Sequence, residues 1–252
     1  GSFIKLSSQI GINIMAIRKT AKPDMELLDE DYAVEDCLLS KKIQVLLAWF
    51  SLLVPDMKNE EEQLLDEALM EVYRRFGITY NNESIYADGS KRVLKRMPVL
   101  GDLYQILKDN PRTERIAIIL NRFINGSARY FNQQDNVDLA NPYTVFDLSD
   151  LRNSKLQPLA MLIVLDFVWD CIKEDCTQRK AVITDELWQL IGSTATKQSS
   201  DFVVDIYRLI RAYSGAAISA SQNLSDYEGE AGRVILNTSK TKILLNLETD
   251  EA

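Results

Sequence analysis

The sequence of 252 residues lacks several features that define common protein classes. It contains no histidine, which excludes serine–histidine and cysteine–histidine catalysis. Its three cysteines, Cys37, Cys171 and Cys176, are too few for a disulfide framework and have no zinc-binding spacing, so we expect reduced thiols. No apolar run reaches the roughly 20 residues that a membrane helix needs, and no secretory signal sequence opens the chain.

The charge is also unbalanced, with a formal net value of −8. This argues against a phosphate-binding surface spread over the whole fold, although it leaves room for a local basic stripe. The sequence also lacks the P-loop motif Gly-x4-Gly-Lys-Ser/Thr, whose backbone N–H groups cradle nucleotide phosphates. Gly89-Ser90-Lys91 is only a fragment of such a motif, in a polar stretch.

The middle of the chain has the periodicity of helices and no strand alternation. Asn59 is expected to cap one helix, since three acidic residues follow it, and Gly77 is expected to end that helix. The expected helices of this all-helical block cover residues 34–54, 59–76, 98–108 and 112–124.

The last part of the chain alternates short apolar runs with helical segments. Strands that are apolar on both faces and separated by helices are typical of a parallel sheet covered on both sides. The sequence therefore predicts an α/β fold with an inserted all-α block. The expected strands cover residues 3–6, 144–148, 181–184, 216–220 and 242–247, and the expected helices cover 156–176, 199–213 and 229–237.

Two acidic residues, Asp185 and Glu186, directly follow the apolar run 181–184. Ligands of parallel sheets bind beyond the carboxyl ends of the strands. An aspartate there can hold the Mg²⁺ shell of a nucleotide, and a glutamate after it can act as general base for the attacking water. The same two acids could instead simply cap the following helix, and these residues alone leave both interpretations open.

Three more polar residues could take part in nucleotide hydrolysis. Gln222 comes just after the run 216–220, where its amide could sense the γ-phosphate or orient the water; otherwise it is an ordinary strand-end residue. The helix before that run ends near Arg208 and Arg211. Either arginine could act as an arginine finger on a neighbouring subunit's nucleotide, or could lie on a solvated helix face.

In this order, the motifs resemble the C-terminal ATPase region of the VirB/TraC/TraE-type conjugation ATPases. These are the motors of type IV secretion systems and belong to the HerA/FtsK-like P-loop superfamily. The sequence Val-Ile-Thr-Asp-Glu-Leu-Trp at 182–188 matches the Walker B motif of the family. Residues 219–223 resemble its Gln motif, and 237–245 resemble its closing Asn-x4-Lys strand.

The resemblance implies roles for individual residues. Asp185 would be the acid that holds Mg²⁺ through water, and Glu186 would be the catalytic base. Thr184 and Gln222 would join Asp185 in binding the nucleotide, with Gln222 as the sensor. Arg211 would be the arginine that acts in trans; the family often has a second basic residue directly after it, but Ala212 follows here, which leaves Arg208 as a rival.

The resemblance also implies an architecture, a partial RecA-like parallel sheet of the P-loop NTPase fold with an inserted all-α subdomain. Residues 1–30 would form the N-terminal strand region, 31–135 the helical subdomain, and 136–252 the core with Walker B. The parent protein would use ATP and Mg²⁺ and would form a homo-oligomer, expected to be a hexamer. It would work with other secretion components in the cytoplasm, at the inner face of the membrane.

Since the family's P-loop lies upstream of the matching region, we expect a C-terminal fragment that alone hydrolyses ATP poorly or not at all. Two alternatives remain open. A HerA/FtsK-type DNA translocase or coupling protein shares the motif arrangement, although the charge does not indicate DNA binding. A non-catalytic helical docking module on a degenerate ATPase scaffold is the second alternative.

Overall fold

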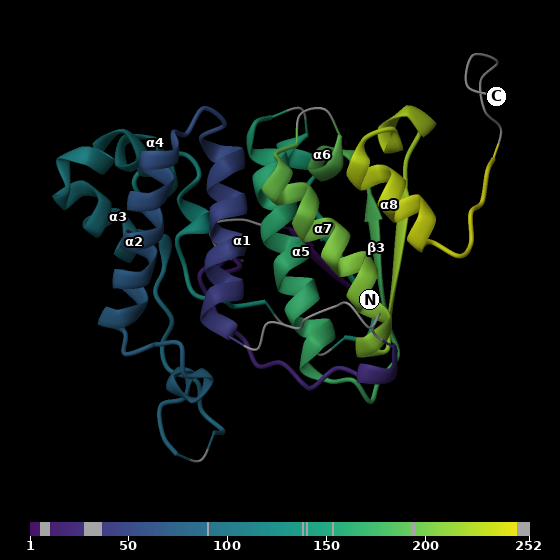
Figure 1. Ribbon diagram of the computed structural model, residues 1–252, viewed down its shortest axis with the longest axis horizontal. Helices are drawn as coiled ribbons and strands as arrows, with labels where there is room; N and C mark the ends of the chain where they lie inside the picture. The colour runs from purple at the N-terminus through teal and green to yellow at the C-terminus, as the bar shows by residue number, and fades with distance from the viewer. Residues whose placement is uncertain are drawn as a thin grey trace. The chain divides into compact units, whose positions relative to one another are not determined.

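The computed structural model describes residues 1–5, 11–27, 37–89, 91–137, 139, 141–152, 154–192 and 195–245. The chain divides into two compact units. Unit 1 comprises Gly1–Arg18 and Val34–Phe167, and unit 2 comprises Lys19–Ala33 and Val168–Ala252. The long helix α5 (Leu156–Glu174) contributes residues to both units (Figure 1).

Unit 1 contains the helical block. Its helices are α1 (Leu38–Leu53), α2 (Asn59–Arg75), α3 (Leu100–Asp109) and α4 (Glu114–Ile124). They pack around fully buried aromatic rings, with the ring centroids of Trp49 and Phe123 5.1 Å apart. The expected helices are therefore confirmed, apart from residues 34–36 of the first, which lie outside the described residues.

The start of α2 differs by one residue from the expectation. Asn59 is the first helical residue, and Lys58 occupies the N-cap position. The Glu61 carboxylate accepts a hydrogen bond of 3.0 Å from the Lys58 backbone N–H. The cap thus forms around the acid in the first turn. Gly77 follows the helix with a φ of +69°, which confirms it as the residue that ends α2.

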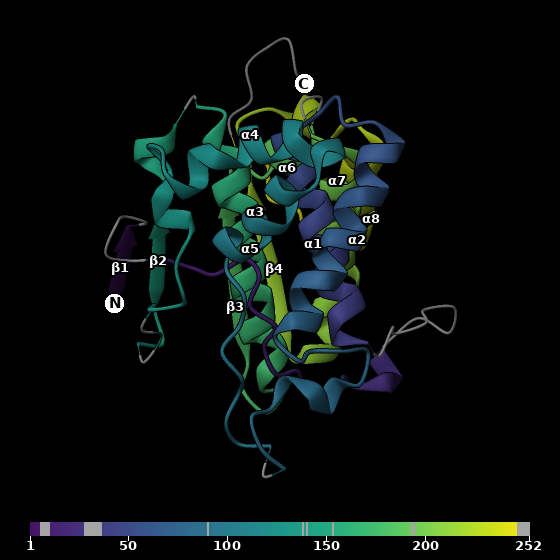
Figure 2. The ribbon, with the colours of Figure 1, turned by 90° about the vertical axis from the view of Figure 1, so that its left-hand side faces the viewer.

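Unit 1 also holds one pair of parallel strands, β1 (Ser2–Lys5) and β2 (Thr144–Asp147). Ser2 lies opposite Thr144, so segments far apart in sequence meet side by side (Figure 2). Both strands were expected, although Leu6 of the first expected run lies outside the described residues.

Unit 2 is a strand–helix–strand unit with further helices. Strands β3 (Lys180–Asp185) and β4 (Gly215–Ala220) pair in parallel, with Lys180 opposite Gly215 and Asp185 opposite Ala220. The helices of this unit are α6 (Trp188–Ile191), α7 (Lys197–Leu209) and α8 (Glu230–Thr238). With parallel strands and an all-helical block, the expected α/β fold class is confirmed.

Short 3-10 helices connect the main elements at Met25–Leu27 (η1), Asn82–Ile85 (η2), Pro111–Thr113 (η3), Arg129–Phe131 (η4), Ser149–Leu151 (η5), Ile210–Tyr213 (η6) and Leu224–Tyr227 (η7). Within the described part of the chain, no helix is long and apolar enough to cross a membrane.

Two expectations about the sheet are wrong. Residues 242–245 form no strand, and Ile243 and Leu245 are more than 80% exposed; 246 and 247 lie outside the described residues. The pair β3–β4 is also not covered on both faces, since Ile183 and Ile218 are 67% and 50% exposed. An apolar run shows only that a strand could form, whereas pairing and coverage depend on what packs beside it.

Candidate active site

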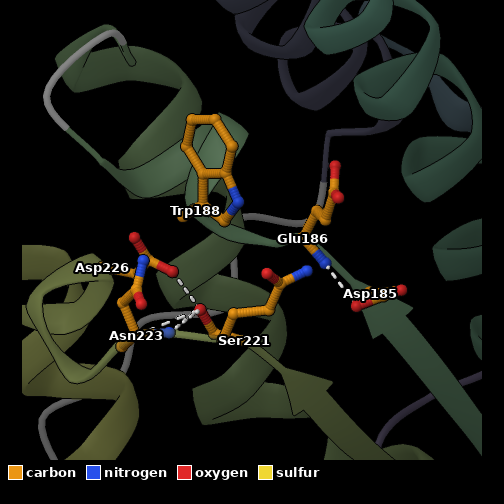
Figure 3. A pocket seen from close by; sticks show the side chains of 7 residues that line it. Asp185, Glu186, Trp188, Ser221, Asn223 and Asp226 are labelled. Carbon is orange, nitrogen blue, oxygen red and sulfur yellow. Dashed lines mark hydrogen bonds between the residues drawn. The ribbon is translucent and has the colours of Figure 1, made fainter. Parts of the chain in front are cut away.

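The site lies where β3 and β4 end. Asp185 is the last residue of β3 and lies opposite Ala220, the last residue of β4. The residues that follow these two strand ends therefore meet at one edge of the sheet. Together they line an open cavity of about 290 Å³ (Figure 3). Its lining residues are Asp185, Glu186, Trp188, Ser221, Gln222, Asn223 and Asp226.

Glu186 has an unusual backbone at this edge. Its φ of +54° lies in the left-handed region, which is rare for residues other than glycine. Its N–H donates a 3.0 Å hydrogen bond to Oδ1 of Asp185, and its Oε2 accepts one of 3.5 Å from Nε2 of Gln189. The turn sends the two successive carboxylates in different directions (Figure 3). One acid can therefore face a cation shell while the other faces a different point of the cavity.

The helix that follows gives little support to a capping role for the two acids. Helix α6 is four residues long, and its N-cap position is Leu187. The Asp185 carboxylate accepts a hydrogen bond from the Glu186 N–H, which lies outside α6. Of the two interpretations left open by the sequence, the geometry favours the pair as lining of a cavity.

The end of β4 is held by the short helix η7. Ser221 Oγ is hydrogen-bonded to the carboxylate of Asp226, and it accepts from the Asn223 N–H at 3.4 Å. The hydroxyl of Tyr227 donates to Ser219 Oγ at 2.9 Å. Both hydrogen bonds to residues of η7 therefore hold the segment that carries Gln222.

The sequence assigned no role to four residues that line this cavity, namely Trp188, Ser221, Asn223 and Asp226. The first three belong to the Walker B and Gln motifs quoted above, whereas Asp226 lies outside both. The residue types after β4 could have indicated part of this arrangement. Serine and aspartate side chains at strand ends commonly bond to the nearby backbone and so shape the turn that follows. Nothing local, however, indicates that the Asp226 side chain returns to Ser221.

Three other expected site residues lie outside the cavity lining. Thr184 is half-buried and lies one residue before Asp185 in the strand, so it belongs to the opposite face of the sheet. Arg211 lies in η6, before the start of β4 and thus at the other end of that strand. Its Nη2 donates to the Leu27 carbonyl at 2.8 Å. Arg208 is exposed near the end of α7. The roles expected for these residues stay predictions.

The donor atoms suit a hard cation held through water. Among the described residues, no group of three or more His, Cys, Asp or Glu side chains could hold a metal ion. The cavity instead presents carboxylate, hydroxyl and amide oxygens, including those of Asp185, Ser221 and Gln222. Mg²⁺ is commonly bound in this way, by one or two carboxylates, its own waters and the phosphates of a nucleotide.

Comparison with known proteins gives the family. The family model described as "TraG P-loop domain" matches residues 105–250, which is more than half of the chain. Among solved structures, VirB4 of Thermoanaerobacter pseudethanolicus superposes with a TM-score of 0.82 and 27% sequence identity. The match covers 99% of this chain but 65% of that VirB4 chain. A search of curated proteins gave no significant match. The chain therefore belongs to the TraG P-loop domain family and is a protein of the conjugation and type IV secretion ATPase type.

Proposed function

We propose that this chain is the metal- and water-handling part of a motor that hydrolyses ATP to power conjugative transfer or type IV secretion. One observation carries the proposal. The Asp185-Glu186 pair and Gln222 follow adjacent parallel strands and line the same cavity, with the two carboxylates pointing in different directions (Figure 3). Family membership supports the same function for the parent protein.

In this proposal each side chain has one task. Asp185, whose carboxylate is oriented by the N–H of Glu186, would hold Mg²⁺ through one of the waters of the ion. Glu186 accepts a proton from the attacking water, and Gln222 orients that water or senses the γ-phosphate. Mg²⁺, when bound with the nucleotide, neutralises charge on the transferred phosphoryl group.

Two further parts of the site must come from elsewhere. The sequence contains no Gly-x4-Gly-Lys-Ser/Thr motif, so the phosphate cradle is proposed to belong to another segment of the parent protein. An arginine from a neighbouring copy, Arg211 or its rival Arg208, would complete the site in a homo-oligomer. The isolated chain is accordingly proposed to hydrolyse ATP poorly or not at all, and tight ATP binding by this chain alone in calorimetry would contradict that.

The decisive experiment uses the parent protein together with its P-loop. Glu186→Gln keeps the size of the side chain but removes the base, so we expect ATP binding to persist while kcat falls by about 10²–10⁴-fold. Glu174→Gln, which neutralises an exposed acid at the end of α5, is the matched control and should hydrolyse ATP normally. Unchanged ATPase and transfer activity of Glu186→Gln would refute the catalytic role and favour a non-catalytic docking module.

A further inference from the structure

Ser219 is a polar residue of β4 that lies close to the site in sequence but does not line its cavity. It is opposite Thr184 in the β3–β4 register and precedes Gln222 by three residues. Side chains alternate between the two faces of a strand, and Ser219 lies on the half-buried face of β4. Its side chain can therefore affect the site through the position of the strand end.

Ser219 joins three elements of unit 2. The hydroxyl of Tyr227, in η7, donates to Ser219 Oγ at 2.9 Å. The side chain of Tyr207, in α7, is also hydrogen-bonded to Ser219. Because Ser219 Oγ accepts from Tyr227, its own proton can be donated to Tyr207. We call these three residues the hydroxyl cluster. It links β4 to a helix that precedes the strand in the chain and to one that follows it.

Burial makes the hydrogen bonds of the hydroxyl cluster costly to lose. Tyr227 is 9% exposed, and Tyr207 is half-buried. Burial raises the pKa of Tyr207 to about 12, against an opposing effect of its hydrogen bond with Ser219, so this hydroxyl stays neutral at ordinary pH. A buried hydroxyl that loses its partner keeps the full cost of its desolvation. Without Ser219 Oγ, the elements that carry the two tyrosines would therefore have to shift.

Gln222 lies in the chain between the residues that the hydroxyl cluster joins. Ser219 precedes it by three positions, and Tyr227 follows it by five. Gln222 is exposed, and its amide has no hydrogen-bonding partner among the described residues. The place of this amide in the cavity therefore depends on the backbone of the segment that carries it, which the cluster holds at both ends.

We propose that the hydroxyl cluster positions the Gln222 amide, with Ser219 as its central positioning residue. The inference rests on the role in hydrolysis proposed above for Gln222. An amide can orient the attacking water only from the correct distance, and a displacement of about 1 Å can lower a rate by about 10²-fold. The cluster supplies this precision from outside the cavity.

The test measures kcat and KM for ATP in the parent protein together with its P-loop. Gln222→Ala removes the amide, and we expect kcat to fall by about 10²-fold. Ser219→Ala should lower kcat by about tenfold or more and change KM little, because the phosphate cradle is unaltered. In the Gln222→Ala background it should cause no further loss, since the side chain that it positions is already absent. Tyr227→Phe keeps the ring, removes one hydroxyl and should behave in the same way.

Two further variants separate positioning from a general loss of stability. Ser219→Thr retains the hydroxyl and should keep most of the activity. The matched control is Tyr73→Phe, which removes another buried tyrosine hydroxyl, one that donates to the Met15 carbonyl at 2.6 Å in unit 1. It should lower stability without lowering kcat. Unfolding curves establish that each variant is folded at the assay temperature.

The outcomes distinguish this proposal from the proposed function. Losses that multiply in the double variant, or an equal loss of kcat in Tyr73→Phe, would overturn the positioning role. If Gln222→Ala slows hydrolysis but Ser219→Ala and Tyr227→Phe do not, the positioning role fails while the proposed function stands. If Gln222→Ala leaves kcat unchanged, the role of Gln222 in hydrolysis fails, and the positioning role fails with it.

Discussion

At the scale of the single residue, Glu186 combines the proposed catalytic side chain with a left-handed backbone. A residue with a Cβ in this region costs about 1–2 kcal/mol relative to the right-handed region. Such strain persists where the surrounding structure over-determines it, and it often occurs at functional sites. Here its effect is visible, since the turn separates the directions of the two carboxylates.

The strained backbone predicts how substitutions of Glu186 change the stability of the chain. Glu186→Gly should leave stability unchanged or raise it by up to about 1 kcal/mol, because relief of strain is partly offset by the greater entropy of unfolded glycine. Glu186→Val should lower stability, because a β-branched residue fits the left-handed region worst. Urea unfolding of this chain measures both. A glycine variant clearly less stable than the valine variant would contradict the argument.

At the scale of the element, the start of α2 shows how one acid organises a helix end. The Glu61 carboxylate accepts from the Lys58 N–H and forms an ion pair with Arg115 of α4 at 2.8 Å. The hydrogen bond from Lys58 and then the bond from Arg115 lower the pKa of Glu61 below its usual value of 4.5. Glu61 therefore stabilises both the end of α2 and its contact with α4.

This lowered pKa predicts a pH dependence. Because the folded-state pKa lies below the unfolded one, the stabilisation is fully present above about pH 4.5 and is lost as the pH falls through the folded-state pKa. Glu61→Gln should cost about 1 kcal/mol at pH 7, and the difference from the unaltered chain should shrink in acid. Denaturant unfolding at several pH values measures it. Glu62→Gln removes the same charge from the same turn and should show a smaller effect.

The connection between β4 and η7 is also held by side-chain hydrogen bonds. Two hydrogen bonds, from Ser221 to Asp226 and from Tyr227 to Ser219, join a strand end to a short helix that sequence periodicity does not reveal. Each of these hydrogen bonds joins a residue that precedes Gln222 in the chain to one that follows it. A strand end could be predicted from apolar character, but the side-chain contacts that hold its polar continuation could not.

At the scale of the whole molecule, one face of the β3–β4 pair is exposed, although the sequence predicted a sheet covered on both faces. Ile183 and Ile218 are direct partners in the register and are 67% and 50% exposed. Adjacent exposed β-branched side chains on a sheet form a continuous apolar patch rather than scattered surface residues. Such patches favour association with other proteins or with copies of the chain.

We therefore expect the isolated chain to self-associate at high concentration, and Ile183→Thr/Ile218→Thr to reduce that association. Threonine retains the β-branched shape that suits a strand, so the fold should persist. Ile118→Thr is the control, because Ile118 is also 67% exposed but lies on α4. Sedimentation velocity over a range of concentrations compares them. An equal reduction in the control, or none in the double variant, would argue against a role for this patch.

The sequence alone determined most of the helices and strands, the α/β class and the polar residues that end the two strands of the site, although it also predicted a strand at 242–247 that residues 242–245 do not form. These features depend on neighbours in the chain, through periodicity, caps and the residues adjacent to a strand. The expectation for Asn59 failed by only one position, since Glu61 supplies the acceptor for the helix end.

Tertiary structure alone decided which polar residues meet. It put Gln222 beside Asp185 and Glu186, brought Asp226 to Ser221, and left Thr184 outside the cavity lining. It also left Ile183 and the run 242–245 exposed. The physical reason is that strand pairing and burial depend on surfaces distant in sequence. The apolar character of a residue therefore does not show whether another part of the fold will cover it.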